Sequence, residues 1–252
     1  EMCIRDSGPS AITIDSIGNL YTANINADNV TKITPAGVST TLGVTGSLPI
    51  AITIDSSGNI YTANLGSNNV TKITPTGVST IYGTTGTSPI AITIDSSGII
   101  YTANFNDNTV SMIPSAGISI MAGTTGVNPR GITIDSSGNI YTANQSDDNV
   151  TKITPAGVST IHGVTGAGPV GITIDLSGNI YTANSGPNNV TKITSAAAPS
   201  APTLDSVVAG DRRATISFTA GANNGAAITD YEYSLNGGAY TSAGTTTSPF
   251  TI

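Results

Sequence analysis

Short runs of alternating hydrophobic and polar residues follow one another along most of this chain, separated by glycine, proline and asparagine. In one stretch the runs are AITID at 51–55, NIYTAN at 59–64, NVTKIT at 69–74 and GVSTI at 77–81. Isoleucine, tyrosine and threonine are typical of β-strands, and Gly or Pro recurs too often for a helix to extend. The stretch therefore predicts four short strands.

The third run breaks the strict alternation of a strand, because two apolar residues, Val30 and Ile33 in the first copy, lie three positions apart. Either a β-bulge interrupts this strand, or neighbouring sheets cover both of its faces. Both explanations stay open at the level of the sequence.

The pattern recurs with a period of 40 residues, and each copy contains ITIDSSGNIYTAN or a near variant. The aspartates of this segment are Asp15, Asp55, Asp95, Asp135 and Asp175. Four strands in about 40 residues is the period of a β-propeller blade. We therefore predict an all-β chain in which residues 8–194 form a β-propeller with four complete four-stranded blades and a partial fifth. Such an array is either an open arc or a five-bladed ring.

The segment P-x-G-I-T-I-D-S-S-G-N-I-Y-T-A-N-x-x-x-N-N-V resembles the NHL repeat, and it is similar to the blades of the streptogramin lyase and gluconolactonase-like propellers. The resemblance covers residues 9–194. It implies a β-propeller, and it leaves two classes of function open, a binding module and a lyase or hydrolase.

A second module follows the repeats. SAAAPSAPT begins at Ser195 and is typical of a linker, which we place at 195–202. Residues 203–252 contain ATISF and ITDYEYSLNGG and resemble a truncated fibronectin type III domain, with Phe218 where that family commonly has Trp. A sandwich of this kind needs roughly 90–100 residues, so the resemblance implies that its last strands lie outside this sequence.

The first seven residues, EMCIRDS, have no counterpart in the repeats. They can be encoded by a string containing AGATGTGTATAAGAGACAG, which resembles a transposon end used to prepare sequencing libraries. We therefore expect residues 1–7 to be an artefactual leader joined to a bacterial gene fragment of environmental origin; the alternative is a natural tail. In the first case Cys3 carries no information about the redox compartment.

Composition restricts the partners. The net charge of −7 argues against nucleic acid, whose phosphates require patches of Lys and Arg, and no apolar run is long enough to insert in a membrane. Charged residues make up only 9% of the chain, so hydroxyl and amide groups must form its surface. We expect an extracellular or cell-surface protein with a protein or carbohydrate partner.

Repeated polar residues have structural explanations. A calcium loop needs several oxygen ligands in one turn, whereas each repeat offers one carboxylate, so we expect Asp15 and its copies to cap their own hairpins. We expect the repeated tyrosines, beginning with Tyr21, to pack between blades. The lysines at 32, 72, 152 and 192 are expected to be solvated.

The repeats offer little for catalysis. Residues 8–194 contain no Glu, no G-x-S-x-G segment and one histidine, His162, whereas acid–base chemistry near neutral pH needs a His or a tuned carboxylate beside a partner. We therefore expect no catalytic residues, no metal and no cofactor, and favour a binding module. The alternative is a streptogramin lyase-like or gluconolactonase-like enzyme whose site lies in blades outside this sequence.

One rim of the propeller is the candidate binding surface. The DSSGN and TPAGV loops of one rim are nearly constant among the copies, whereas the loops of the opposite rim vary. A rigid scaffold that carries variable loops is a common way to build a binding surface. We predict a site formed by Phe105, Asp107, Arg130, Asp147 and Asp148; the alternative is neutral drift in exposed loops.

Overall fold

The computed structural model describes residues 8–195, 200–222 and 228–252. The chain divides into two compact units, one ending at Ile193 and the other comprising Thr194–Ile252. The interpretation of residues 1–7 as an artefactual leader lies outside the described residues and stays a prediction. The described residues contain no helix that is long and apolar enough to cross a membrane.

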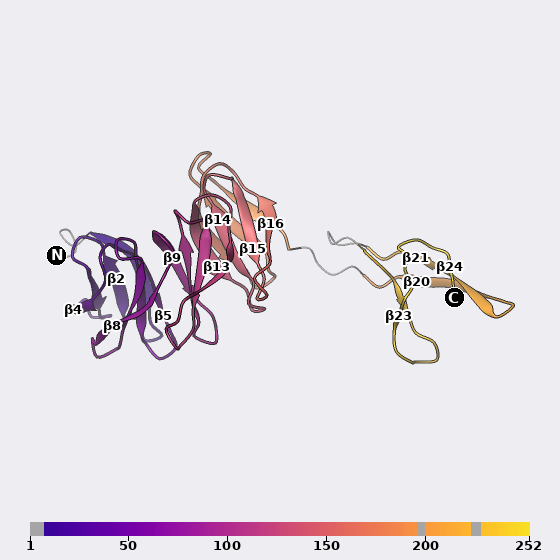
Figure 1. Ribbon diagram of the computed structural model, residues 1–252, viewed down its shortest axis with the longest axis horizontal. Helices are drawn as coiled ribbons and strands as arrows, with labels where there is room; N and C mark the ends of the chain where they lie inside the picture. The colour runs from indigo at the N-terminus through magenta and orange to yellow at the C-terminus, as the bar shows by residue number, and fades with distance from the viewer. Residues whose placement is uncertain (1–7, 196–199, 223–227) are drawn as a thin grey trace. The chain divides into compact units, whose positions relative to one another are not determined.

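The first unit consists of antiparallel sheets that follow one another in chain order, as the colours of Figure 1 show. The first two sheets contain β1 (Pro9–Ile14), β2 (Leu20–Asn24), β3 (Asn29–Ile33) and β4 (Ser39–Val44), then β5 (Pro49–Ile54), β6 (Ile60–Asn64), β7 (Asn69–Ile73) and β8 (Ser79–Thr84). The next two contain β9 (Pro89–Ile94), β10 (Ile100–Asn104), β11 (Thr109–Ile113) and β12 (Ile120–Thr124), then β13 (Pro129–Ile134), β14 (Ile140–Asn144), β15 (Asn149–Ile153) and β16 (Ser159–Val164). The last sheet contains β17 (Pro169–Ile174), β18 (Ile180–Asn184) and β19 (Asn189–Ile193). The predicted repetition of four-stranded antiparallel sheets is confirmed.

An aspartate closes the first hairpin of each sheet. Asp135 Oδ1 accepts hydrogen bonds from the backbone N–H groups of Ser137 (2.9 Å) and Asn139 (2.8 Å), and Oδ2 accepts from Asn139 Nδ2 (2.8 Å) and Tyr141 Oη (3.1 Å). Gly138 completes the turn with φ of 80°, a value that glycine adopts without strain. The predicted cap is confirmed.

The core of this unit lies between consecutive sheets. Tyr21 and Val30 of the first sheet form a buried cluster with Ile52 and Ile73 of the second. Equivalent clusters at the next three junctions join Tyr61 to Ile100, Tyr101 to Ile140, and Tyr141 to Ile180. The prediction that the tyrosines pack between sheets is therefore confirmed for the first four copies. The fifth, Tyr181, lies on the last sheet and is only partly buried.

Glycines in the outer strands allow the sheets to approach each other closely. A Cβ added to Gly123 in β12 would lie 2.7 Å from Cγ2 of Ile153 in the next sheet. The same distance would separate a Cβ on Gly83 from Cγ2 of Ile113. These glycines are therefore needed for close packing of the sheets, because a methyl group would occupy the space of the isoleucine.

Both explanations for the broken alternation hold. The pairing of β3 with β4 shifts register between Val30 and Thr31, as in a β-bulge, and the shift recurs in the next three sheets. In the second sheet Val70 and Ile73 are both fully buried, because a neighbouring sheet covers each face.

Three of the strand lysines, which we predicted to be solvated, also cover part of the sheet surface. Lys32, Lys72 and Lys152 are half-buried. Lys72 Nζ lies 5.7 Å from the ring centroid of Tyr61, at which distance the ammonium group is attracted to the ring face. The aliphatic part of such a side chain can cover apolar surface while the charge reaches solvent.

The second unit is smaller and also all-β. One sheet has the order β20 (Thr203–Gly210), β21 (Arg213–Thr219) and β24 (Phe250–Thr251), and the other pairs β22 (Glu232–Tyr233) with β23 (Thr241–Ser242). Phe218 is buried against Tyr231, with ring centroids 4.3 Å apart in an edge-to-face arrangement. An aromatic residue thus occupies the core at position 218, while assignment of the unit to fibronectin type III stays a prediction.

Candidate functional site: the variable rim

The variable loops connect strands whose directions alternate, so they gather at one edge of each sheet. Each turn after the second strand places a non-glycine residue in the left-handed region, for example Asn68, Asn108 and Asp148 with φ of 51°, 55° and 53°. Asparagine and aspartate tolerate this conformation better than most residues, which explains the Asn- and Asp-rich composition of these loops.

The carboxylates of this rim hold the connections between sheets. Asp148 Oδ1 accepts a 2.8 Å hydrogen bond from the backbone N–H of Gly168, and Asp147 Oδ2 accepts one of the same length from Val127. Asp107 Oδ2 accepts in the same way from the backbone N–H of Thr87. We predicted that these three aspartates bind a partner. Instead, their side chains accept hydrogen bonds from the backbone of the segments that connect one sheet to the next.

Arg130 lies on the second residue of β13 and is fixed by two neighbours. Its guanidinium carbon lies 5.4 Å from the ring centroid of Phe105, and its Nε donates a 2.6 Å hydrogen bond to Oε1 of Gln145. The three side chains come from two adjacent sheets and are all half-buried. Within the described part of the chain no carboxylate forms an ion pair with Arg130.

The structure thus brings together two of the five predicted site residues, Phe105 and Arg130, and adds Gln145, which the sequence analysis missed. A signal for Gln145 was present, because the equivalent residues of the first three copies are apolar: Ile25, Leu65 and Phe105. The polar residue therefore appears in the same copy as Arg130, which replaces isoleucine. We call Phe105, Arg130 and Gln145 the rim cluster.

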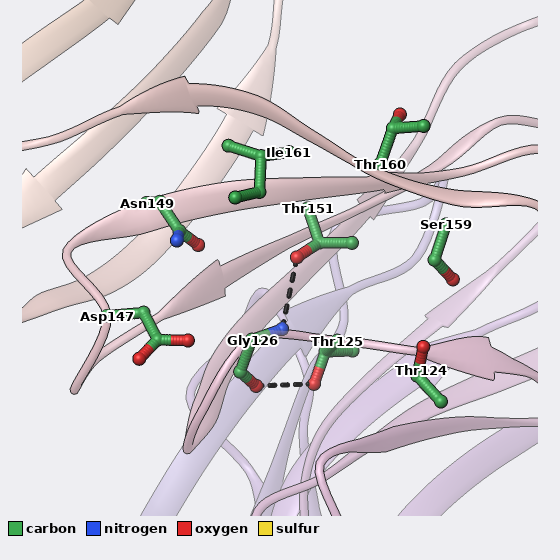
Figure 2. Close-up of a pocket in the computed structure, with 9 residues that line it drawn as sticks. All are labelled: Thr124, Thr125, Gly126, Asp147, Asn149, Thr151, Ser159, Thr160 and Ile161. Carbon is green, nitrogen blue, oxygen red and sulfur yellow. Dashed lines mark hydrogen bonds between the residues drawn. The ribbon is translucent and has the colours of Figure 1, made fainter.

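A groove of about 290 Å³ borders Asp147 on the outer side of the fourth sheet. Figure 2 shows the backbone N–H of Gly126 donating to Thr151 Oγ1 at 3.1 Å across it, while Thr125 Oγ1 donates to the carbonyl of Gly126. The residues that line the groove are mostly hydroxyl-bearing: Thr124, Thr125, Gly126, Asp147, Asn149, Thr151, Ser159, Thr160 and Ile161. Such a lining suits neutral hydrogen-bonding groups.

An equivalent groove of about 250 Å³ occurs 80 residues earlier in the chain, with Ser67 in the position of Asp147. The buried hydroxyls of Ser79 and Ser159, one in each groove, have no hydrogen-bond partner among the described residues.

His162 packs edge-on against an aromatic ring of its own sheet. It belongs to the outer strand β16, and its ring centroid lies 5.1 Å from that of Tyr141 in an edge-to-face arrangement. Burial, and then the positive charge of Lys152, lower the pKa of His162 below its ordinary value. In the described ranges, moreover, no group of three His, Cys, Asp or Glu residues is arranged to hold a metal ion.

Comparison with known proteins identifies the family. The model of the virginiamycin B lyase family matches residues 1–205. A search of curated proteins finds no matching sequence.

Solved structures share the fold at low sequence identity. Virginiamycin B lyase from Staphylococcus aureus is 18% identical with a TM-score of 0.64, and the match covers 96% of this chain and 86% of that one. A chain of a nidogen/laminin complex is 17% identical with a TM-score of 0.63, covering 74% and 76%. Hydrazine synthase of Kuenenia stuttgartiensis is 16% identical with a TM-score of 0.61, covering 85% and 78%. The first unit is therefore a β-propeller fold, and the chain belongs to the virginiamycin B lyase family.

Proposed function

We propose that this chain is a non-catalytic interaction module, extracellular or on the cell surface, whose variable rim contacts an acidic group of a protein or glycan partner. The observation that carries the proposal is the environment of Arg130, a half-buried cation without a carboxylate partner among the described residues. Its guanidinium is half-buried and oriented by Phe105 and Gln145, yet no carboxylate of the described residues neutralises it.

The orientation of the Arg130 guanidinium suits an anionic ligand. The hydrogen bond to Gln145 uses Nε, so the terminal N–H groups of the guanidinium remain available to a carboxylate. The ring of Phe105 shields one face of the cation and restricts its rotamers. A partner carboxylate would therefore meet an oriented donor, which lowers the entropic cost of binding.

A propeller neighbour supports a protein partner. One of the chains with a similar fold comes from a nidogen/laminin complex, so this fold can serve in the association of proteins. The grooves beside Asp147 and Ser67 supply neutral hydrogen-bonding groups next to the rim, as a glycan would require.

Replacing Arg130 with alanine tests the proposal. The probes are an array of acidic and neutral glycans and a set of Glu-rich peptides with their Gln-substituted counterparts. We expect selective binding of the acidic probes, and a loss of at least about tenfold, or 1.4 kcal/mol, in Arg130→Ala. Ser57→Ala on the constant rim and Arg213→Ala in the second unit are the matched controls and should bind like the unmodified chain. Equal loss in Arg130→Ala and Arg213→Ala would show that net charge, not the rim cluster, determines binding.

A lyase of the streptogramin type is the second candidate, because family membership favours it. One solved neighbour is a catalytically inactive H270A variant of virginiamycin B lyase bound to quinupristin, so quinupristin is the appropriate substrate. Chromatographic conversion of quinupristin by the purified chain, abolished in His162→Ala, would establish this candidate in place of the binding module. Among the described residues Nε2 of His162 has no hydrogen-bond partner, which favours the first proposal instead.

A further inference from the structure

The groove beside Asp147 lies between two consecutive internal sheets. The end of β12 and the segment that follows it form one wall, whereas β15, β16 and the loop before β15 form the other, as Figure 2 shows. Two hydrogen bonds join the walls. The backbone N–H of Gly126 donates to Thr151 Oγ1 at 3.1 Å, and that of Val127 donates to Asp147 Oδ2 at 2.8 Å. The groove of about 290 Å³ is therefore formed before any ligand arrives.

Two polar side chains in this groove retain hydrogen-bonding capacity. Asp147 Oδ2 accepts from the backbone, but Oδ1 has no partner among the described residues. Asn149 Oδ1 accepts a 2.7 Å hydrogen bond from Asn144 Nδ2, whereas Asn149 Nδ2 donates to no group in the part of the chain that the structure describes. The groove thus offers a charged acceptor and an amide donor two residues apart. One hydroxyl group of a ligand can donate to the carboxylate while a neighbouring hydroxyl accepts from the amide.

The rest of the lining combines an aliphatic surface with hydroxyl groups. Ile161 is 71% exposed, and the buried hydroxyl of Ser159 has no hydrogen-bond partner among the described residues. A pyranose ring presents C–H groups on its face and hydroxyl groups around its edge, so it matches this combination. An anionic group would be repelled by the carboxylate of Asp147. The groove therefore suits a neutral sugar.

The equivalent groove between the first and second sheets differs in one informative position. Asn69 and Ile81 line it in the same way, but Ser67 stands in the position of Asp147. Ser67 Oγ accepts a 2.7 Å hydrogen bond from the backbone N–H of Ser47, which is the equivalent connection between sheets. A serine can thus make this connection, and the charge of Asp147 is not needed for it.

From these contacts we infer that the groove beside Asp147 is a subsite for one pyranose unit of a neutral glycan. Two adjacent hydroxyls of the sugar bond to Asp147 Oδ1 and Asn149 Nδ2, and its C–H face lies against Ile161. The inference rests on the proposed function as an interaction module, and adds to it a second site whose ligand carries no charge. The groove beside Ser67 takes the same ligand more weakly, because a neutral hydroxyl is a poorer acceptor than a carboxylate.

Asp147→Ser tests the subsite, because it introduces the residue found in the equivalent groove and keeps an acceptor for the backbone N–H of Val127. The probes are the neutral methyl glycosides of glucose, galactose and mannose, titrated against the chain and followed by NMR chemical shifts. We expect at least one of them to bind the unmodified chain with millimolar affinity. Asp147→Ser should weaken that binding at least about tenfold. The spectrum of the free variant shows in the same experiment whether its fold is retained.

Asp148→Asn is the matched control. It removes the same charge from the neighbouring residue, which does not line the groove. Its equivalent in the second copy, Asn68, accepts a 2.8 Å hydrogen bond from the backbone N–H of Ser88, so asparagine keeps the connection between sheets. Asp148→Asn should bind the methyl glycosides like the unmodified chain.

The outcomes separate this subsite from the rim cluster. Failure of acidic probes to bind the unmodified chain would refute the role of Arg130, whereas binding of the methyl glycosides that depends on Asp147 would still establish the subsite. The subsite is overturned if no methyl glycoside binds, or if Asp147→Ser and Asp148→Asn have equal effects. Loss of methyl glycoside binding in Arg130→Ala would also overturn it, because these sugars would then occupy the rim cluster.

Discussion

At the scale of single residues, the repeated aspartate accepts hydrogen bonds from backbone and side chains of its own hairpin. In the fourth sheet Asp135 accepts four hydrogen bonds, from Ser137, from both nitrogens of Asn139 and from Tyr141. Burial raises the pKa of this carboxyl group, but the hydrogen bonds outweigh burial, so its pKa lies below the ordinary value of 3.8. Burial and the adjacent Asp135 also raise the pKa of Tyr141 to about 12.

This network predicts an acid-sensitive contribution to stability. Because the folded-state pKa of Asp135 is lowered, its contribution is fully present above 3.8 and is lost as pH falls through the folded-state value. We expect Asp135→Asn to lower the free energy of unfolding by about 1–3 kcal/mol at neutral pH, since an amide cannot accept all four bonds. The deficit should shrink as the pH falls through the folded-state pKa. Urea unfolding over a pH series measures it.

Asp211→Asn is the control for that series, because Asp211 is exposed and lies in the second unit. It should change the unfolding free energy by less than about 0.5 kcal/mol. A deficit in Asp135→Asn that stays constant at every pH would contradict a role for the ionised carboxylate.

At the scale of elements, glycines in the outer strands determine how closely neighbouring sheets pack. Gly123 leaves no space for a methyl group, because its Cβ would lie 2.7 Å from Cγ2 of Ile153. Gly171, in the inner strand β17, has room, since its Cβ would meet only the Cβ of Ala183 at 3.8 Å. Two copies carry alanine at the equivalent of Gly171 in internal sheets, Ala51 and Ala91.

The two glycines form a matched pair for mutation. We expect Gly123→Ala to lower the free energy of unfolding of the first unit by about 1–3 kcal/mol through overpacking. Gly171→Ala should be neutral or slightly stabilising, because alanine reduces the entropy of the unfolded chain. Chemical denaturation followed by circular dichroism compares them. Equal effects of the two substitutions would show that the spacing between sheets adjusts to the added methyl group without loss of unfolding free energy.

The strands and their repetition could be predicted from the sequence because each copy carries the same turn residues and apolar pattern. The role of the rim aspartates could not. Loop variation alone does not distinguish a side chain that faces a partner from one that accepts a backbone N–H of a neighbouring link, as Asp147 does from Val127. The pairing of Arg130 with Gln145 was also missed, since it joins residues 15 positions apart on different elements.

At the scale of the whole first unit, internal sheets are covered by a neighbouring sheet on both faces, whereas among the described residues of this unit the last sheet is covered on one face only. The strand β15 is paired on both sides by β14 and β16, and neighbouring sheets cover both faces of its sheet. Within the described residues the strand β19 is paired with β18 alone, and Val190 is exposed. Stability should therefore be lower at the end of the array than in its interior, as expected for a stack of repeated units.

Amide hydrogen exchange tests this gradient with an internal control, because β15 and β19 have the same sequence, NVTKI. The intrinsic exchange rates of Val, Thr, Lys and Ile in the two strands are therefore matched, and a difference in protection reports structure alone. At low protein concentration we expect the amides of 190–193 to exchange at least about tenfold faster than those of 150–153, a difference in opening free energy of about 1.4 kcal/mol. Equal protection of the two strands would contradict the gradient, because it would mean that the outward side of β19 is covered as well as β15 is.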